Sequence, residues 1–183
     1  MNKLFPYFIL FFALNVFSQK EANFWYFGQG AGLDFSYNPP RALTDGQLDT
    51  AEGCSSFSSP SGELLFYSDG IEVFNKDHEL MTYSDGSLAN DLKGNPSSTQ
   101  SGMIIPKPGS TSIYYLFTVG TDFVPNDIDP NPGFNYYTID FSTNPLGEIT
   151  DGPVNLAINP NTNADLSNVW SEKVAAVKGM GCD

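Results

Sequence analysis

Short runs of aromatic and β-branched residues alternate with turns rich in Gly, Pro, Asp and Ser along almost the whole chain after residue 18. No twelve-residue window in this part keeps apolar residues at the i, i+3, i+4 and i+7 spacing of an amphipathic helix without a Gly, a Pro or a β-rich run breaking it. Runs of roughly four to eight alternating residues, bounded by turn residues, are typical of strands. The pattern therefore predicts an all-β fold.

The predicted strands recur as a unit in which an aromatic strand, a tight turn and a second alternating strand follow one another. Residues 23–36 and 63–77 each contain the whole unit, and the second contains the strong hairpin-turn signal Asp69-Gly70. A third aromatic strand is predicted at 112–120, and an insertion rich in Asp, Asn and Pro separates it from its partner. The remaining strands are expected at 54–59, 101–106, 134–142 and 173–179.

The centres of the three aromatic strands, Tyr26, Phe66 and Leu116, are 40 and 50 residues apart. Spacings of about 40–50 residues are typical of β-propeller blades, which contain about four strands each. We therefore expect residues 19–183 to form a partial, unclosed β-propeller of about three four-stranded blades, as the N-terminal portion of a longer propeller. A compact β-sandwich is the alternative, because an unclosed set of blades leaves sheet edges and faces unburied.

Residues 1–18 have the three regions of a secretory signal peptide. Lys3 supplies the positive charge, residues 4–14 form the apolar region, and the small side chains of Val16 and Ser18 suit a cleavage site. The apolar region is too short to span a bilayer, and no stop-transfer charges follow it. We expect export by the Sec route, no membrane span in the mature chain, and a secreted or cell-surface location.

The charge of the chain narrows the range of partners. There are 8 basic and 21 acidic residues, which give a formal net charge of −13. Removal of residues 1–18 takes away Lys3 and no acidic residue, so the mature chain has 7 basic residues against 21 acidic ones and a net charge of −14. A polyanionic surface repels nucleic acid and anionic lipid, so neither is an expected partner.

Several segments of the chain resemble, in the same order, a known family of secreted proteins. These segments are NFWYFGQGAGLDF, AEGCSSFSSPSGELLFYSDGIEVFNKDHELM, GNPSSTQSGMIIPKPG, IYYLFTVG and SEKVAAVKGMGCD, which together span most of residues 23–183. The family is that of gliding-motility-associated surface proteins with a WD40- or YVTN-like β-propeller. The resemblance implies a propeller fold and type IX secretion through a C-terminal sorting domain, which this sequence does not contain, and it implies no catalytic residues.

These features together predict an exported scaffold without enzymatic activity. It is expected to mediate contacts with extracellular protein or glycan in adhesion or gliding, and to engage the export machinery. No arrangement of a nucleophile beside a base is visible along the chain. The alternative is a secreted carbohydrate-active propeller enzyme, because 21 acidic residues offer many carboxylate pairs.

Most individual residues with chemical potential have a structural interpretation. The single histidine, His78, lies in a polar turn and is expected to be exposed to solvent. Three aromatic residues could stack on sugars, namely Trp25, Tyr83 and Trp170, although a core position is expected for the first of them. Four aspartates precede glycine and fit turns through their side chains: Asp45, Asp69, Asp85 and Asp151.

The two cysteines, Cys54 and Cys182, leave two interpretations open. A disulfide between them would suit an oxidising compartment, and two free thiols are the alternative, because the sequence does not give the distance between their Cα atoms. Two cysteines are too few for a zinc site. No cofactor is expected apart from the calcium candidate described next.

The candidate metal site is the segment NDIDPNPG, residues 126–133. Asp127, Asp129 and Asn131 supply oxygen ligands at every second position, as in a calcium-binding loop. The segment departs from the calcium-loop pattern because Gly133 comes one residue late and Thr138 stands where a bidentate Glu is needed. A solvated loop stiffened by proline is the alternative interpretation.

A calcium titration followed by thermal unfolding distinguishes these two interpretations. A calcium site predicts that millimolar calcium raises the midpoint of thermal unfolding, because an ion that binds only the folded chain stabilises it. The rise should disappear when Asp127 and Asp129 are both replaced by Asn. An unchanged midpoint in the presence of calcium would leave only the solvated loop.

Overall fold

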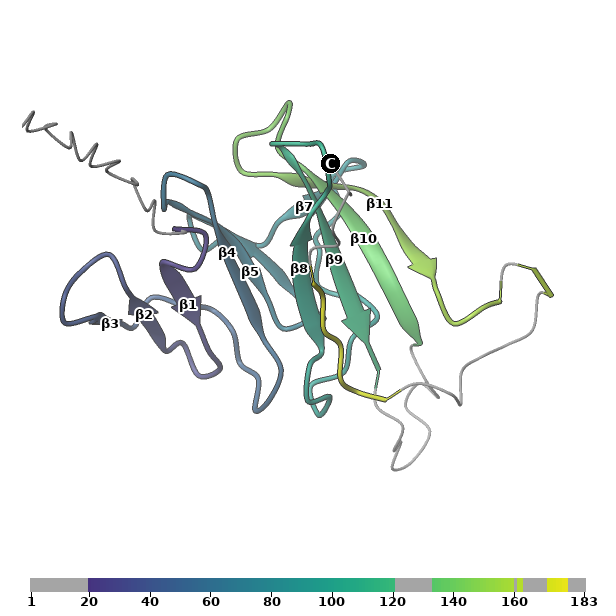
Figure 1. Ribbon diagram of the computed structural model, residues 1–183, viewed down its shortest axis with the longest axis horizontal. Helices are drawn as coiled ribbons and strands as arrows, with labels where there is room; N and C mark the ends of the chain where they lie inside the picture. Colours follow the sequence, from purple (N-terminus) through teal and green to yellow (C-terminus); the bar gives the residue numbers. More distant parts are fainter. Residues whose placement is uncertain (1–19, 121–132, 160, 163–170, 178–183) are drawn as a thin grey trace, which may run out of the picture.

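The computed structural model of the chain describes residues 20–120, 133–159, 161–162 and 171–177 (Figure 1). Within these ranges the chain forms eleven strands and no helix, so the predicted all-β class is confirmed. The strands form three separate sheets of three, three and five strands, and none of the three sheets is closed. The predicted signal peptide, residues 1–18, lies outside the described residues.

The first sheet, called sheet A, is an antiparallel meander of three short strands. It contains β1 (Phe24–Tyr26), β2 (Gly32–Asp34) and β3 (Arg41–Leu43) in the order β1-β2-β3. Tyr26 pairs with Gly32 across the β1–β2 hairpin, and a Cβ atom on Gly32 would lie only 3.0 Å from the Tyr26 ring. The glycine therefore makes room for the aromatic ring of the neighbouring strand.

The second sheet, called sheet B, is a second antiparallel meander. It contains β4 (Ser55–Ser58), β5 (Leu64–Ser68) and β6 (Val73–Asn75) in the order β4-β5-β6. The predicted Asp69-Gly70 turn joins β5 to β6: the Asp69 carboxylate accepts the backbone N–H groups of Ile71 and Glu72 at 2.9 and 2.8 Å, and Gly70 has a φ of +87°. Glycine suits this position because its left-handed backbone conformation costs little without a Cβ atom.

The third sheet, called sheet C, is larger and mixed. It contains β8 (Gly102–Pro106), β9 (Ile113–Val119), β10 (Phe134–Asp140) and β11 (Glu148–Asn155), and the short β7 (Thr82–Tyr83) pairs in parallel with β11. The order across the sheet is β7-β11-β10-β9-β8. The loop that carries β7 thus comes from the chain between sheets B and C and completes the edge of sheet C.

The observed strands confirm the predicted ranges at 54–59, 101–106, 112–120 and 134–142, and they correct two details. Each sheet was expected to have four strands, whereas the sheets have three, three and five. The aromatic strands are also not equivalent: β1 lies at the edge of its sheet, whereas β5 lies in the centre of its own. In sheet A the ring of Tyr26, on the edge strand, lies against Gly32 of the central strand.

The strand expected at 173–179 is absent from the described part of that range, residues 173–177. This segment does not pair with any strand; the Lys173 N–H donates to the Ser171 hydroxyl at 3.3 Å, and the contacts to the rest of the chain involve Gln100. The Gln100 N–H donates to the carbonyl of Glu172, and the Val174 N–H donates to the side-chain oxygen of Gln100. Residues 172–174 therefore lie beside the chain that leads into β8.

One edge strand of each sheet, β1, β4 and β8, lies next to the others, and serine side chains of β4 join them. The hydroxyl oxygens of Ser56 and Ser58 accept the backbone N–H groups of Tyr26 and Phe24, at 2.8 and 3.4 Å. On the other side of β4, Ser55 accepts the N–H of Ile104 on β8 at 3.3 Å. Successive side chains of a strand point to opposite faces, so the Ser-rich β4 satisfies edge donors of both neighbouring sheets.

Sheet B lies between sheets A and C (Figure 1), and it contributes to a hydrophobic core on each of its faces. Between sheets A and B the buried residues are Tyr26, Leu43, Leu48, Leu64, Tyr67 and Phe74. Between sheets B and C they are Phe66, Val73, Met81, Ala89, Leu92, Ile104, Tyr114, Leu116, Tyr137, Ile139 and Ile149. Sheet B is therefore the middle layer of the molecule.

Replacement of Phe66 by Ala is expected to lower the free energy of unfolding by about 3–5 kcal/mol, because it leaves a cavity in a fully buried site. The matched control is Val177→Ala, since Val177 is 92% exposed and its truncation should change the free energy of unfolding by less than about 0.5 kcal/mol. Chemical denaturation measures both variants. Equal effects of the two substitutions would contradict the assignment of Phe66 to the core.

Candidate functional site

A hollow with a volume of about 580 Å³ lies beside β7 and β11. We call it the Tyr83 hollow, and its lining residues are Tyr83, Asp85, Ser87, Leu88, Asn90, Asp91, Gly152 and Pro153. One wall is the loop that follows β7, and the other is part of β11. Its volume lies in the range of about 300–1,000 Å³ that is common for small-molecule sites.

The loop wall of the Tyr83 hollow is held in one shape by its own hydrogen bonds. The Tyr83 N–H donates to the Ser87 carbonyl at 2.8 Å, and the Gly86 N–H donates to the Tyr83 carbonyl at 2.9 Å. Thr82 and Leu88 form an antiparallel bridge that closes the loop. Gly86 has a φ of +87°, a conformation that favours glycine. A short, tightly bonded turn therefore carries Tyr83 and Asp85, and Asp91 follows it three residues after Leu88.

The second wall depends on an irregularity in the pairing of β10 with β11. The register shifts between Tyr136 and Thr138, and Gly152 lies at this point with a φ of +119°. A Cβ atom on Gly152 would come within 2.6 Å of the ring of Tyr137 and 2.9 Å of the Tyr136 carbonyl oxygen. Only glycine lets β11 approach the Tyr137 ring so closely, and this approach places Pro153 against the hollow.

The hollow is negatively charged and contains a phenol. The Tyr83 hydroxyl donates to Asp91 at 3.3 Å, and burial, together with the nearby Tyr137, Asp91 and Asp85, raises the pKa of Tyr83. Asp85 accepts the hydroxyl and the N–H of Ser87, at 2.6 and 2.9 Å, and these hydrogen bonds lower the pKa of its carboxyl. No Lys or Arg is among the lining residues. The polar groups of the hollow are therefore a phenol, two carboxyl groups, a hydroxyl and an amide.

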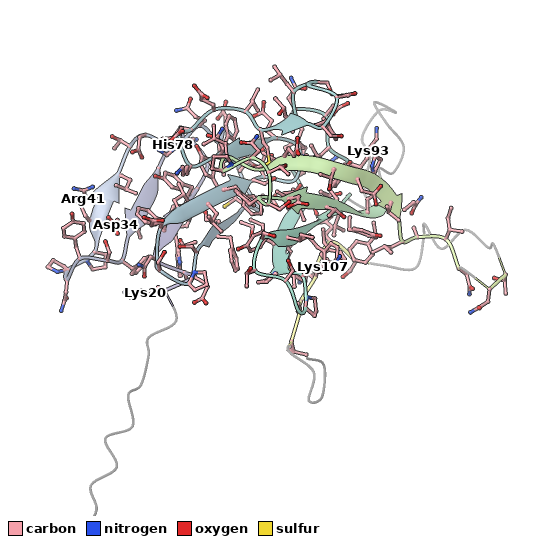
Figure 2. The ribbon with its side chains drawn as sticks, turned by 90° about the horizontal axis from the view of Figure 1, so that it is seen from above. Lys20, Asp34, Arg41, His78, Lys93 and Lys107 are labelled. Carbon is pink, nitrogen blue, oxygen red and sulfur yellow. The ribbon has the colours of Figure 1, made fainter. Side chains whose placement is uncertain are left out.

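A separate polar network lies between sheets A and B and includes His78, which is labelled in Figure 2. The Tyr26 hydroxyl donates to Asp45 at 3.1 Å, and the Tyr67 hydroxyl lies 2.9 Å from His78 Nδ1. The Nε2 atom of His78 lies 3.6 Å from the second oxygen of Asp45. The expectation of a solvent-exposed histidine is wrong, because the His78 side chain is only 22% exposed and contacts the rings of Tyr26 and Tyr67.

The Tyr67 hydroxyl is the centre of this network. Its oxygen accepts the Gln47 N–H at 3.2 Å, and the same hydroxyl forms the 2.9 Å hydrogen bond with His78 Nδ1. The other ring nitrogen of His78, Nε2, faces Asp45. The two ring nitrogens of His78 thus face Tyr67, a fully buried residue of sheet B, and Asp45, which follows sheet A in the chain. The network therefore links sheets A and B.

Trp25 does not occupy the core position expected for it. Its side chain is 46% exposed, its indole N–H donates to the Ala22 carbonyl at 3.0 Å, and its ring lies 4.9 Å from that of Phe35. Alternation along β1 explains the difference, because Tyr26 faces sheet B and its neighbour must face the other way. A smaller hollow of about 240 Å³ lies beside it and is lined by Trp25, Tyr26, Phe27, Cys54, Ser55 and Ser56.

The predicted metal and disulfide residues fall largely outside the described part of the chain. Asp127, Asp129 and Asn131 lie there, as do Cys182 and Trp170, so the calcium site and the disulfide stay predictions. Cys54 is half-buried, and burial together with the charge of Asp69 raises the pKa of its thiol. Within the described ranges no group of three or more His, Cys, Asp or Glu side chains is placed to hold a metal ion.

The four aspartates that precede glycine have different roles. Asp69 and Asp85 accept backbone N–H groups within their own turns, as predicted. Asp45 instead accepts the Tyr26 hydroxyl, and Asp151 lies inside β11, so the turn prediction is wrong for Asp151. Of the lining residues of the Tyr83 hollow, sequence reasoning singled out Tyr83 as a sugar-stacking candidate and Asp85 only as a turn residue.

Sequence reasoning missed the other lining residues with side chains of interest, which are Leu88, Asn90, Asp91 and Pro153. A usable signal was present in the segment TYSDGSLAND, residues 82–91, where an aromatic residue is followed by a turn and a second aspartate. Nothing along the chain could place Pro153 in the same site, because β11 reaches the loop only through the parallel β7–β11 pairing.

Comparison with models of protein families, with curated proteins and with solved structures finds no match to this chain. The described residues also contain no helix that is long and apolar enough to cross a bilayer.

The free energy of unfolding is expected to fall when the pH rises above 10, because two fully buried tyrosines resist ionisation. Burial raises the pKa of Tyr67 and that of Tyr137 to about 12, above the ordinary value of 10.0. A pKa that is raised in the folded state gives stability that is complete below pH 10 and is lost as the pH rises through 12. Urea unfolding at several pH values should show a loss of about 1.4 kcal/mol per pH unit for each tyrosine over this interval.

The Tyr67→Phe variant is the control for this pH dependence. Its slope between pH 10 and 12 should be smaller by the contribution of one tyrosine, about 1.4 kcal/mol per pH unit, while the other tyrosines with raised pKa values keep theirs. It should also be less stable at neutral pH by about 1–2 kcal/mol, since the Gln47 N–H loses its acceptor. An unchanged slope would show that Tyr67 ionises as easily in the folded chain as in the unfolded one.

Proposed function

We propose that the chain is an exported, non-enzymatic scaffold of β-propeller type that contacts extracellular protein or glycan through its loops. The observation that carries this proposal is the Tyr83 hollow, which combines an aromatic ring, two carboxylates and apolar side chains on rigidly bonded loops. Loops held by a sheet scaffold are where binding sites commonly lie. The hollow is built by the β7 loop and β11, which are far apart in the sequence.

The propeller part of the proposal is supported by how the sheets are arranged. Blades of a propeller stack face to face around an axis, with the same strand of each blade innermost. In this chain one edge strand from each sheet, β1, β4 and β8, lies beside the others, and sheet B is covered on both faces. Residues 172–174 then return to the start of β8, as a further innermost segment would. The resemblance to gliding-motility-associated propellers points in the same direction.

The location at the cell surface is supported by the sequence of the first 18 residues and by the acidic composition. A signal peptide directs the chain out of the cytoplasm, and type IX secretion and a role in gliding belong to the same proposal through the family resemblance. A formal net charge of −13 favours neutral or basic partners over nucleic acid.

A carbohydrate-active enzyme is the second candidate function. The observation in its favour is that Asp85 and Asp91 line the same hollow. Two carboxylates that flank a sugar are the usual equipment for glycoside hydrolysis. In that reaction one carboxylate stays ionised and the other carries a proton as the acid, and the hydrogen bonds from Ser87 that hold the pKa of Asp85 low suit it to the ionised role. The enzyme is placed second because no observation assigns the acid role.

The two candidates differ in whether a bound glycan is cleaved. The chain, expressed with its own leader, is incubated with polysaccharide and extracellular-protein panels, and both retention on the ligand and release of reducing ends are measured. We expect retention without release, and weaker retention of Tyr83→Ala. Tyr37→Ala is the matched control, because Tyr37 is exposed and is not among the residues lining the hollow. Release of reducing ends that disappears in Asp91→Asn would contradict the scaffold and establish the enzyme.

A further inference from the structure

We propose that the Tyr83 hollow binds an uncharged sugar unit of a glycan, with the sugar ring against Tyr83 and its hydroxyls donating to Asp85 and Asp91. This inference rests on the proposed function and makes it more specific, because it chooses glycan over protein and names the residues that recognise it. It follows from the shape of the hollow, from its apolar residues and from its acceptors.

The shape and the apolar residues suit a sugar ring. A volume of about 580 Å³ is within the range of small-molecule sites, so a compact unit can enter. Three lining residues offer apolar surface: the ring of Tyr83, the side chain of Leu88, which is 51% exposed, and the ring of Pro153. One face of a pyranose ring carries mainly C–H groups, and such a face packs on aromatic and aliphatic surfaces.

The acceptors suit sugar hydroxyls. Each carboxylate has one oxygen that accepts a hydrogen bond from the protein: Asp85 from Ser87, and Asp91 from Tyr83. The second oxygen of each aspartate accepts no hydrogen bond from any other described residue. Hydrogen bonds from hydroxyls to ionised carboxylates are shorter and stronger than neutral ones. Asn90 adds an exposed amide, which can donate as well as accept.

The charge of the hollow excludes acidic sugars. Two carboxylates line it without a basic residue among the lining residues, and the whole chain has a net charge of −13. An incoming carboxylate or sulfate would meet like charge and would have to be desolvated without a partner. A basic side chain would also find favourable charge, and its alkyl stem could pack on Leu88 or Pro153, so oligolysine is included as a probe in the experiment below. The uncharged sugar uses both kinds of surface.

The experiment measures binding of neutral hexasaccharides of glucose, mannose, galactose and N-acetylglucosamine by calorimetry and by saturation-transfer NMR. Oligolysine and polygalacturonate serve as the basic and acidic probes. The expected result is binding of at least one neutral hexasaccharide, with little change on going from low salt to about 0.5 M NaCl, since no ion pair is formed. Polygalacturonate should not bind.

The variants separate the roles of the ring and the carboxylates. Tyr83→Ala is expected to weaken binding by more than about tenfold, and Tyr83→Phe by less than about threefold because it keeps the ring. Asp91→Asn should weaken binding by about tenfold, since a charge-assisted hydrogen bond becomes a neutral one. Tyr37→Ala should bind like the unmodified chain. Urea midpoints, measured for every variant, show that each one is folded.

The outcomes distinguish this inference from the proposed function. No binding of any neutral hexasaccharide at about 10 mM would overturn the sugar site, and so would binding that Tyr83→Ala leaves unchanged. Salt-sensitive binding of oligolysine alone, lost in Tyr83→Ala, would overturn the sugar and keep the scaffold with a protein partner. Cleavage of a bound hexasaccharide would keep the sugar site and overturn the non-enzymatic function.

Discussion

The opposite orientation of Phe66 and Tyr67, two adjacent residues in the centre of sheet B, is the constraint on which the rest of the structure depends. Both side chains are fully buried, and alternation along β5 sends one into the core with sheet C and the other into the core with sheet A. Tyr67 stacks on Tyr26 of sheet A at 4.5 Å, and Phe66 packs on Tyr114 of sheet C at 5.8 Å. A dipeptide on one strand thus couples two cores that share no other layer.

The same cores position the loops through tyrosine hydroxyls at their margins. Tyr67 accepts the backbone N–H of Gln47, and Tyr137 accepts that of Lys93, at 3.2 and 2.9 Å. In each case a buried ring ends in a hydroxyl that fixes a segment without secondary structure. His78 and Lys93, labelled towards opposite ends of the molecule in Figure 2, mark the two places. Near Lys93, the ring of Tyr137 also lies against Gly152 of β11. The Tyr137 side chain therefore contacts both β11 and the segment that follows the β7 loop, which lie on the two sides of the Tyr83 hollow.

The parts of the structure that sequence reasoning predicted are those decided by local chemistry. The Asp69-Gly70 turn and most of the aromatic strands follow from neighbouring residues, and they are found as predicted. The membership of each sheet depends on distant pairing, and the parallel contact of β7 with β11 carries no local signal. The exposure of Trp25 and the partial burial of His78 likewise depend on which face of a strand or turn meets another sheet.

The candidate site shows the same division. Tyr83 and Asp85 belong to a turn whose form is visible in the sequence, whereas their proximity to Pro153 requires the fold. The missing information is the register irregularity at β10–β11, which depends on the absence of a side chain at Gly152. A sequence pattern therefore shows which kinds of residue a site contains more readily than it shows which distant residues come together there.

The serine hydroxyls of β4 have a consequence for how such a chain can change over evolution. Ser55, Ser56 and Ser58 bind backbone N–H groups of the adjoining sheets, and every residue except proline supplies such a donor. The contacts therefore depend on the backbone of β1 and β8 and place little demand on the side chains of those strands. Substitutions in β1 and β8 that keep the strands in place can leave these hydrogen bonds intact.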